Sequence, residues 1–186
     1  DPTILDKEGK SFLFYCISEG IKNISILQKI VLLGYDINSK NGQNKTLLME
    51  SINHYLNTPK DNVEIKNSHL EMIKELIDLG INVNALDNDN ETLLFILVRH
   101  GNRELLHLFL ETNKMNLNYQ NNQDETPLLL MALNGIKNAD LIKLFLEKGA
   151  NPDLKNQMGK SIIEILVDII LYSENRKPLE FEYEIF

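Results

Sequence analysis

The sequence predicts an all-α solenoid of about five helix–turn–helix units, and three recurring spacings support this prediction. Ser or Thr opens an apolar run at five places, separated by 35, 46, 34 and 35 residues. An apolar quartet with the spacing i, i+1, i+4, i+5 lies between successive openings and forms one face of an amphipathic helix. Three residues after each quartet stands Gly or Asn, which tolerate the left-handed conformation that ends a helix. The openings are Ser11, Thr46, Thr92, Thr126 and Ser161; the quartets begin at Ile26, Met72, Leu105 and Leu141; the stops are Gly34, Gly80, Asn113 and Gly149.

Each element of the unit has its own reason. The first helix packs between neighbouring units and is therefore apolar nearly all round, as in residues 93–98 and 128–133. Thr92 and Thr126 are expected to cap two of these helices with their hydroxyls, an interaction worth about 1 kcal/mol. The links 36–45, 82–91, 116–125 and 151–160 are rich in Asn and Asp, which favour turns, so we expect them to project as fingers.

One unit is longer than the others. The distance from the opening residue to its quartet is 26 residues after Thr46, against 15, 13 and 15 elsewhere. The excess, roughly a dozen residues, falls within residues 55–68, whose Pro, Asn and mixed charge predict a surface loop. This loop is either a tolerated insertion or a binding loop.

The segment from Asp124-Glu125-Thr126-Pro127-Leu128 to Gly149-Ala150-Asn151-Pro152 closely resembles an ankyrin repeat, and residues 87–118 are a second good copy. The resemblance extends to about residue 171. It implies an array over residues 1–172 with protruding β-turn fingers, followed by an acidic and aromatic tail over residues 173–186. The implied repeats are 6–40, 41–86, 87–120, 121–155 and an incomplete 156–172. The His that the family places after Thr-Pro-Leu is replaced here by Phe14, Met49, Phe95, Leu129 and Glu164.

Both ends of the chain depart from the repeat. Residues 1–11 align with residues 151–161 at an offset of 150, which indicates a start inside a repeat and a piece of a longer protein. At the other end, the helix that opens at Ser161 lacks a second helix and is too apolar to face water as a terminal unit. Residues 179–186 alternate apolar and acidic side chains. We expect this tail to fold back on the final helix or to be offered to a partner as an extended strand.

Composition and motifs favour a binding protein over an enzyme. The net charge is −8, which argues against a nucleic-acid partner, and no apolar run is long enough to span a membrane. The lone Cys16 indicates a buried apolar residue in a reducing compartment. No nucleophile, base or metal-ligand constellation is found, so we expect no catalytic residue, metal or cofactor.

The resemblance implies that partners bind the concave side formed by the finger tips and the exposed faces of the first helices. Charge along the fingers is graded: Lys7, Lys10, Lys40 and Lys45 come first, Asp89, Glu91, Asp124 and Glu125 follow, and Lys155 and Lys160 come last. Arg99, His100 and His54 beside Leu133 are the best candidates for an interface hot spot. The candidate contact residues are Gln43, Lys45, Asn53, His54, Asp89, Glu91, Arg99, His100, Gln123, Glu125, Leu133 and Asn134.

The function that these observations favour is a non-enzymatic module that binds a partner protein, with no nucleic acid and no membrane involved. The alternative is a regulatory or targeting ankyrin region of a larger enzyme or effector whose active domain lies outside this sequence. We expect a monomer, with self-association through the exposed terminal repeats as the other outcome. The expected location is the cytoplasm, or the host cytoplasm for an effector.

Overall fold

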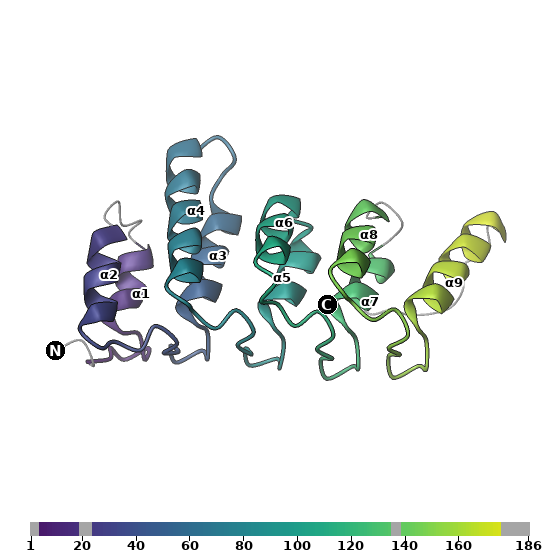
Figure 1. Ribbon diagram of the computed structural model, residues 1–186, viewed down its shortest axis with the longest axis horizontal. Coiled ribbons are helices and arrows are strands. Elements are labelled where there is room, and N and C mark those ends of the chain that lie inside the picture. Colours follow the sequence, from purple (N-terminus) through teal and green to yellow (C-terminus); the bar gives the residue numbers. More distant parts are fainter. Residues whose placement is uncertain (1–3, 19–23, 135–138, 176–186) are drawn as a thin grey trace. The chain divides into compact units, whose positions relative to one another are not determined.

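A computed structural model describes residues 4–18, 24–134 and 139–175 (Figure 1). The chain divides into two compact units, Asp1–Ile96 and Leu97–Phe186. The helices of the described residues are α1 (Phe12–Ser18), α2 (Ile24–Leu32), α3 (Leu47–Asn57), α4 (Val63–Asp78), α5 (Leu93–His100), α6 (Arg103–Glu111), α7 (Pro127–Leu133), α8 (Ala139–Glu147) and α9 (Ile162–Asn175).

The helices follow the predicted alternation of an inner helix, a turn and an outer helix. In the first unit α3 packs against both α1 and α4, and in the second α7 packs against both α8 and α9. The described residues contain no strand; their β-structure is limited to two isolated bridges, Lys40 with Thr46 and Leu86 with Thr92. The all-α class with ankyrin-type units is therefore confirmed.

The predicted helix stops adopt the left-handed backbone. Gly34, Gly80, Asn113 and Gly149 all have positive φ, between 52° and 95°. The four apolar quartets are buried apart from three residues: Ile26 and Leu146, which are exposed, and Val31, which is half-buried. Leu146 belongs to the outer helix α8, and the described residues supply no outer helix after α9 to cover it.

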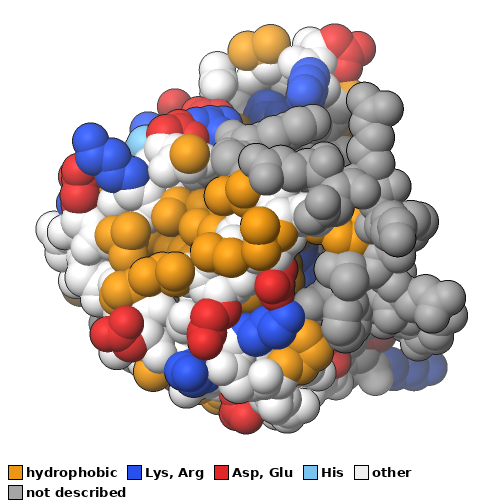
Figure 2. All heavy atoms as spheres, turned by 90° about the vertical axis from the view of Figure 1, so that its right-hand side faces the viewer, with side chains coloured by type: hydrophobic (Ala, Val, Ile, Leu, Met, Phe, Trp, Pro, Cys, Tyr) orange, Lys and Arg blue, Asp and Glu red, His pale blue; other side chains and the backbone are white. Residues whose placement is uncertain are grey.

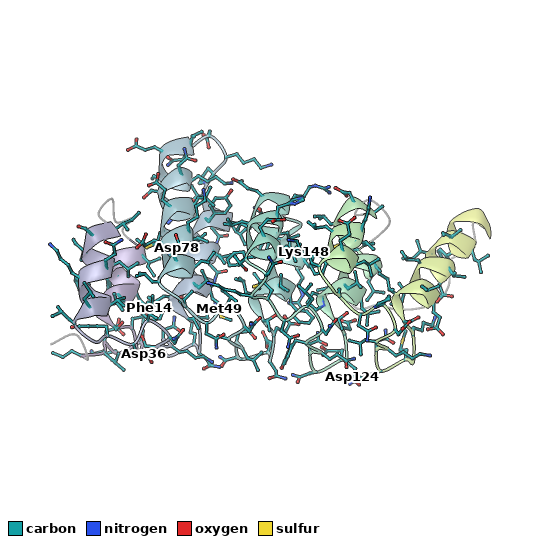
Figure 3. The ribbon with its side chains drawn as sticks, viewed as in Figure 1. Phe14, Asp36, Met49, Asp78, Asp124 and Lys148 are labelled. Atoms are coloured by element: carbon teal, nitrogen blue, oxygen red, sulfur yellow. The ribbon has the colours of Figure 1, made fainter. Side chains whose placement is uncertain are left out.

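Apolar side chains occupy the positions at which the family has His. Phe14 and Met49 lie on α1 and α3 near the fingers (Figure 3), and both are buried, as are Phe95 and Leu129. The fifth position differs, because Glu164 accepts a hydrogen bond from the Ser161 backbone N–H at 2.6 Å, which lowers the pKa of this carboxyl. Packing at four of these positions therefore replaces the polar contacts that a His would make.

The prediction that residues 55–68 form a surface loop is wrong. The extra residues lengthen two helices instead, so that α3 has 11 residues and α4 has 16, against seven to nine in the other paired helices. Only residues 58–62 lie between them. The Asn62 side chain caps α4 by accepting from the Ile65 N–H, and His69 is buried on this helix. Helical continuation wins because α4 carries its apolar stripe back through His69.

Of the two predicted threonine caps, one is confirmed and one is wrong. Thr126 Oγ1 accepts the Leu129 N–H at 3.1 Å, as Thr46 does for Met49 at 3.3 Å. Thr92 Oγ1 is buried and has no hydrogen-bond partner among the described residues. The Phe95 N–H instead donates to the Thr92 carbonyl, at 3.1 Å.

Within the described part of the chain, no helix is long and apolar enough to cross a membrane.

The two threonines provide an opposed pair of tests. Thr126→Val removes a cap and should lower the free energy of unfolding by about 1 kcal/mol. Thr92→Val replaces an unpartnered buried hydroxyl by a methyl group of similar size, so stability should stay unchanged or rise. Urea denaturation followed by circular dichroism measures both; equal losses in the two variants would contradict the assignment.

Candidate functional site

Each finger is built on one side-chain oxygen. An Asp or Asn Oδ1 accepts two backbone N–H groups, from the second and the fourth residue after it, over 2.8–3.1 Å. The third residue after the anchoring Asp or Asn has positive φ, and its N–H donates to the backbone carbonyl of that anchoring residue. Among the described residues five turns have this form, and they begin at Asp6, Asn41, Asp87, Asn121 and Asn156.

This geometry separates finger tips from finger bases. The two residues after the anchoring Asp or Asn are exposed in all five turns, whereas the fourth is half-buried or buried. Among the candidate contact residues, Gln43, Asp89 and Gln123 are tip residues. The full set of tips is Lys7, Glu8, Gly42, Gln43, Asn88, Asp89, Asn122, Gln123, Gln157 and Met158.

The base residues are poorer candidates. Lys45 and Glu125 are half-buried, and Glu91 is only 4% exposed. Glu91 is therefore corrected from a contact residue to a residue inside the finger. The physical reason is the position of Glu91 in the turn. Its N–H donates to Asp87 Oδ1, and its carbonyl accepts the Asp87 N–H. These two bonds hold Glu91 at the base of the finger, next to the helices.

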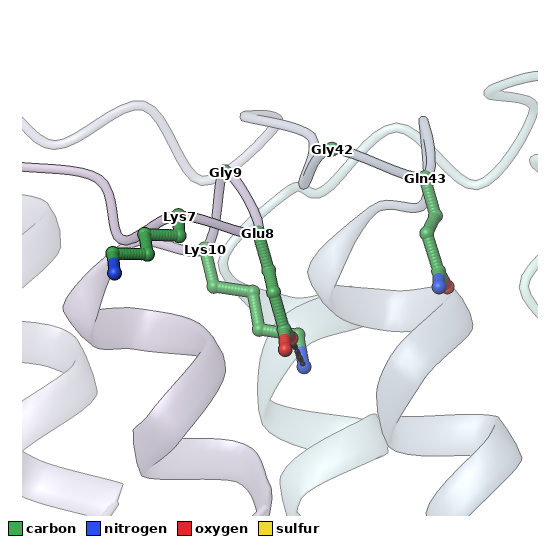
Figure 4. A pocket seen from close by; sticks show the side chains of 6 residues that line it. All are labelled: Lys7, Glu8, Gly9, Lys10, Gly42 and Gln43. Atoms are coloured by element: carbon green, nitrogen blue, oxygen red, sulfur yellow. Dashed lines mark ion pairs between the residues drawn. The ribbon is translucent and has the colours of Figure 1, made fainter.

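In the first unit, neighbouring fingers are joined by backbone. The Gly42 N–H donates to the Glu8 carbonyl at 2.9 Å, and the two turns enclose a hollow of about 330 Å³ (Figure 4). Glu8 and Lys10 form an ion pair at 2.8 Å along its wall, while Lys7 points away from them. Farther along this unit, the Asn82 N–H donates to Asn38 Oδ1 at 2.7 Å.

The second unit repeats the same connections. The Gln157 N–H donates to the Gln123 carbonyl at 3.2 Å, and its side chain donates to the Asn122 carbonyl at 2.7 Å. The Asn151 N–H donates to Asn118 Oδ1, again at 2.7 Å. Gln120 Nε2 reaches the Lys155 carbonyl at 2.9 Å, as Lys40 Nζ reaches the Leu86 carbonyl in the first unit. Within each unit the fingers are therefore fixed relative to one another.

Three lysines of the charge gradient predicted along the fingers form ion pairs within the chain. Lys10 pairs with Glu8, and Glu8 raises the pKa of Lys10. Lys155 and Lys160 pair with Glu164 and Asp168 of α9. Because Glu91 is buried as well, the tips offer mainly amide groups, together with Lys7, Glu8 and Asp89. Amide-rich tips favour recognition by hydrogen bonds over a long-range field.

The residues proposed as a hot spot belong to two different units of the chain. Arg99 and His100 are exposed at the C-terminal end of α5, and Leu133 and Asn134 lie at the end of α7 in the same unit. His54 belongs to α3 in the first unit, where Asn53 and His54 are both half-buried.

His54 has an internal partner that the sequence analysis missed. Its ring is stacked on the ring of His69 with centroids 5.6 Å apart and planes 16° apart. His69 is buried on α4, and burial together with the nearby His54 lowers the pKa of His69. Lys66 Nζ lies 4.7 Å from the centroid of the neighbouring Tyr55 ring. These contacts join α3 and α4. His54 therefore contributes to the packing of the two long helices.

Cys16 is buried, and burial raises the pKa of its thiol, which disfavours the reactive thiolate. Within the described ranges, no three His, Cys, Asp or Glu side chains gather closely enough to hold a metal ion.

The comparisons with known proteins agree with this geometry. Residues 62–156 match the family described as ankyrin repeats (3 copies), which is about half of the chain. The chain belongs to the ankyrin-repeat family, whose repeats are generally modules for protein–protein interaction. Among curated proteins, no sequence matches this chain.

The chain is also similar to a solved structure, that of the predatory endopeptidase Bd0816 from Bdellovibrio bacteriovorus in complex with the immunity protein Bd3460. The TM-score is 0.64 at 23% sequence identity, and the match covers 92% of this chain and 80% of the other. This similarity supports the same fold.

The contact between the first two fingers gives one prediction. A Cβ at Gly42 would lie 2.3 Å from the Glu8 carbonyl oxygen, so Gly42→Ala must push the two turns apart. We expect a loss of about 1–3 kcal/mol in the free energy of unfolding, typical of overpacking. Gln43→Ala, one residue away on the exposed tip, should change stability by less than about 0.5 kcal/mol. Denaturant unfolding of both variants decides; a loss no greater for Gly42→Ala than for Gln43→Ala would refute the contact.

The buried histidine gives a pH prediction. The pKa of folded His69 lies below its ordinary value of 6.5, so the unfolded chain takes up the proton first as the pH falls. The stability that neutral His69 supplies is therefore present above about pH 6.5 and is lost below it. His69→Gln should reduce the drop in unfolding free energy between about pH 7.5 and pH 5.5, and His107→Gln, at an exposed position, should leave it as it is. A drop of the same size in both variants would count against the buried His69.

Proposed function

We propose that this chain is a non-enzymatic module that binds a partner protein through its finger tips and the adjoining ends of its inner helices. The observation that carries the proposal is the repeated tip geometry: ten exposed tip residues stand on turns that share one set of hydrogen bonds. Because these hydrogen bonds fix the backbone of each tip, little loop ordering is needed on binding, so more of the contact energy is available for affinity.

The connections between fingers support the same function. Within each unit a backbone N–H of one finger donates to a carbonyl of the preceding one, which fixes the spacing of the tips. A partner would therefore meet preset positions, spaced by the repeat, at which amide groups and a few charges are offered. Such a surface suits a folded protein with complementary polar groups at matching intervals.

The comparisons support a protein as the class of partner. Ankyrin repeats generally bind proteins, and the similar solved structure is itself a complex between an immunity protein and an endopeptidase. The contact residues that we propose are the tips Gln43, Asp89 and Gln123, with Arg99, His100, Leu133 and Asn134 at the helix ends and Asn53 in a lesser role. We place Lys45, Glu125 and His54 at the margin of this surface, because Lys45 and Glu125 are half-buried at the bases of fingers and the His54 ring is stacked on His69.

The proposal predicts where substitutions weaken binding. A partner is first captured from the source cells, purified and titrated by calorimetry against variants of this chain. Gln123→Ala with Asn122→Ala, and separately Arg99→Ala with His100→Ala, should each weaken binding at least about tenfold, or about 1.4 kcal/mol. Thermal stability should change little, because all four side chains are exposed.

The matched control lies on the outer helices. Lys74→Ala with Lys143→Ala removes two exposed side chains of α4 and α8 and should leave the affinity unchanged. If the outer-helix variant binds more weakly while both tip and helix-end variants bind normally, the partner uses the outer face and the proposed site is wrong.

A further inference from the structure

The second finger contains a chemically labile pair, Asn41 followed by Gly42. A backbone nitrogen can attack the side-chain amide carbon of the asparagine before it, and glycine hinders this attack least because it has no side chain. The Gly42 nitrogen gives its proton to water and bonds to Asn41 Cγ, the bond from Cγ to Nδ2 breaks, and ammonia leaves. Water then opens the cyclic imide to aspartate or to isoaspartate, in which the main chain runs through the side-chain carbon. Water is the only co-reactant that this deamidation needs.

The fold holds the amide group that would react. Asn41 is only 6% exposed. Its Oδ1 accepts the N–H groups of Gln43 and Lys45, and its Nδ2 donates to Glu50 Oε1, each at 3.0 Å. Because Nδ2 departs as ammonia, deamidation cannot proceed without breaking the bond to Glu50.

The attacking nitrogen is held as well, by the neighbouring finger. The Gly42 N–H donates to the Glu8 carbonyl at 2.9 Å, and Figure 4 shows the turn of Gly42 beside the turn of Glu8 and Gly9. The proton that the nitrogen must lose before it attacks is the proton that the Glu8 carbonyl accepts. Ring closure therefore also breaks the backbone bond that joins the first two fingers.

The inner helix explains why this finger is anchored by Asn and the first finger by Asp. Asp6 Oδ2 accepts the Tyr15 hydroxyl of α1 at 2.5 Å, whereas Asn41 Nδ2 donates to Glu50 of α3. Tyr15 and Glu50 hold the same place in their units, four residues after the opening Ser or Thr. A carboxylate at position 41 would face the Glu50 carboxylate, and like charges at this distance repel each other.

We propose that Asn41 is a deamidation site that the contact between the first two fingers protects. While Gly42 is bonded to Glu8 and Asn41 to Glu50, the reaction is blocked. When the two turns part, the imide forms, and the product has lost the donor that faced Glu50. Each conversion is therefore an irreversible record that these fingers have opened, and it leaves them less able to close again.

The protection is tested by measuring conversion at residue 41. The full chain is incubated at mildly alkaline pH, and peptide mapping with tandem mass spectrometry follows the change from amide to carboxylate. Conversion should be at least about tenfold slower in the folded protein than in guanidinium chloride, because it requires local opening. Equal rates in the two conditions, or no conversion in either, would overturn the proposal.

A pair of variants separates local opening from general loss of stability. Glu50→Ala removes the acceptor of Nδ2 and should raise the rate in the folded protein at least about threefold, as expected for one lost hydrogen bond. Thr126→Val, in the second unit, loses a helix cap away from these fingers and should leave the rate unchanged. Circular dichroism verifies that both variants are folded. Equal acceleration by both would show that conversion follows general unfolding, against the proposal.

The effect of the product is tested with the mimic Asn41→Asp. It should lower the guanidinium midpoint of unfolding, because two carboxylates then face each other. Adding Glu50→Gln should recover part of the loss, since the new amide can donate to the new carboxylate. Glu50→Gln alone should change the midpoint little, because its side-chain oxygen still accepts from Asn41. A double variant no more stable than Asn41→Asp would contradict the role assigned to Glu50.

Discussion

The fold depends on one short interaction, in which an Asp or Asn side-chain oxygen receives two backbone N–H groups of its own turn. These five oxygens close the fingers at Asp6, Asn41, Asp87, Asn121 and Asn156. Such a hydrogen bond contributes about 0.5–1.5 kcal/mol to stability, so the two bonds of each turn favour its closed form. The anchoring side chain therefore sets the direction in which the chain leaves one outer helix and enters the next inner helix.

Packing and function use opposite ends of the same turn. The base of each finger leads into an inner helix whose apolar residues are buried, as Leu93 and Leu94 are in α5. The tip residues carry no such demand and stay exposed, so their types can vary without loss of the fold; Gly42, whose backbone contacts Glu8, is the exception. The variation among tips, from Lys7 and Glu8 to Gln157 and Met158, is what a binding surface needs and a core does not tolerate.

Where the chain departs from the family, packing compensates. The family His is replaced by buried apolar residues at Phe14, Met49, Phe95 and Leu129. The hydrogen bonds of the five described turns still form, because the side-chain oxygens of the anchoring Asp and Asn residues accept them. The one long unit adds turns to α3 and α4, and the added length is stabilised by the stacked His54 and His69 rings and by Lys66 over Tyr55. The apolar end at α9 is the place where packing within the described residues remains incomplete (Figure 2).

Local and periodic features were determined by the sequence alone: the helix pairs, the left-handed stops at Gly34, Gly80, Asn113 and Gly149, and the family. They were readable because each depends on residues close together or on a regular spacing. Tertiary structure alone decided which polar residues face water. Glu91 is buried, the Thr92 hydroxyl lacks the partner that Thr126 has, and residues 55–68 are mainly helical. Each of these outcomes depends on neighbours from other parts of the chain, and no local pattern records them.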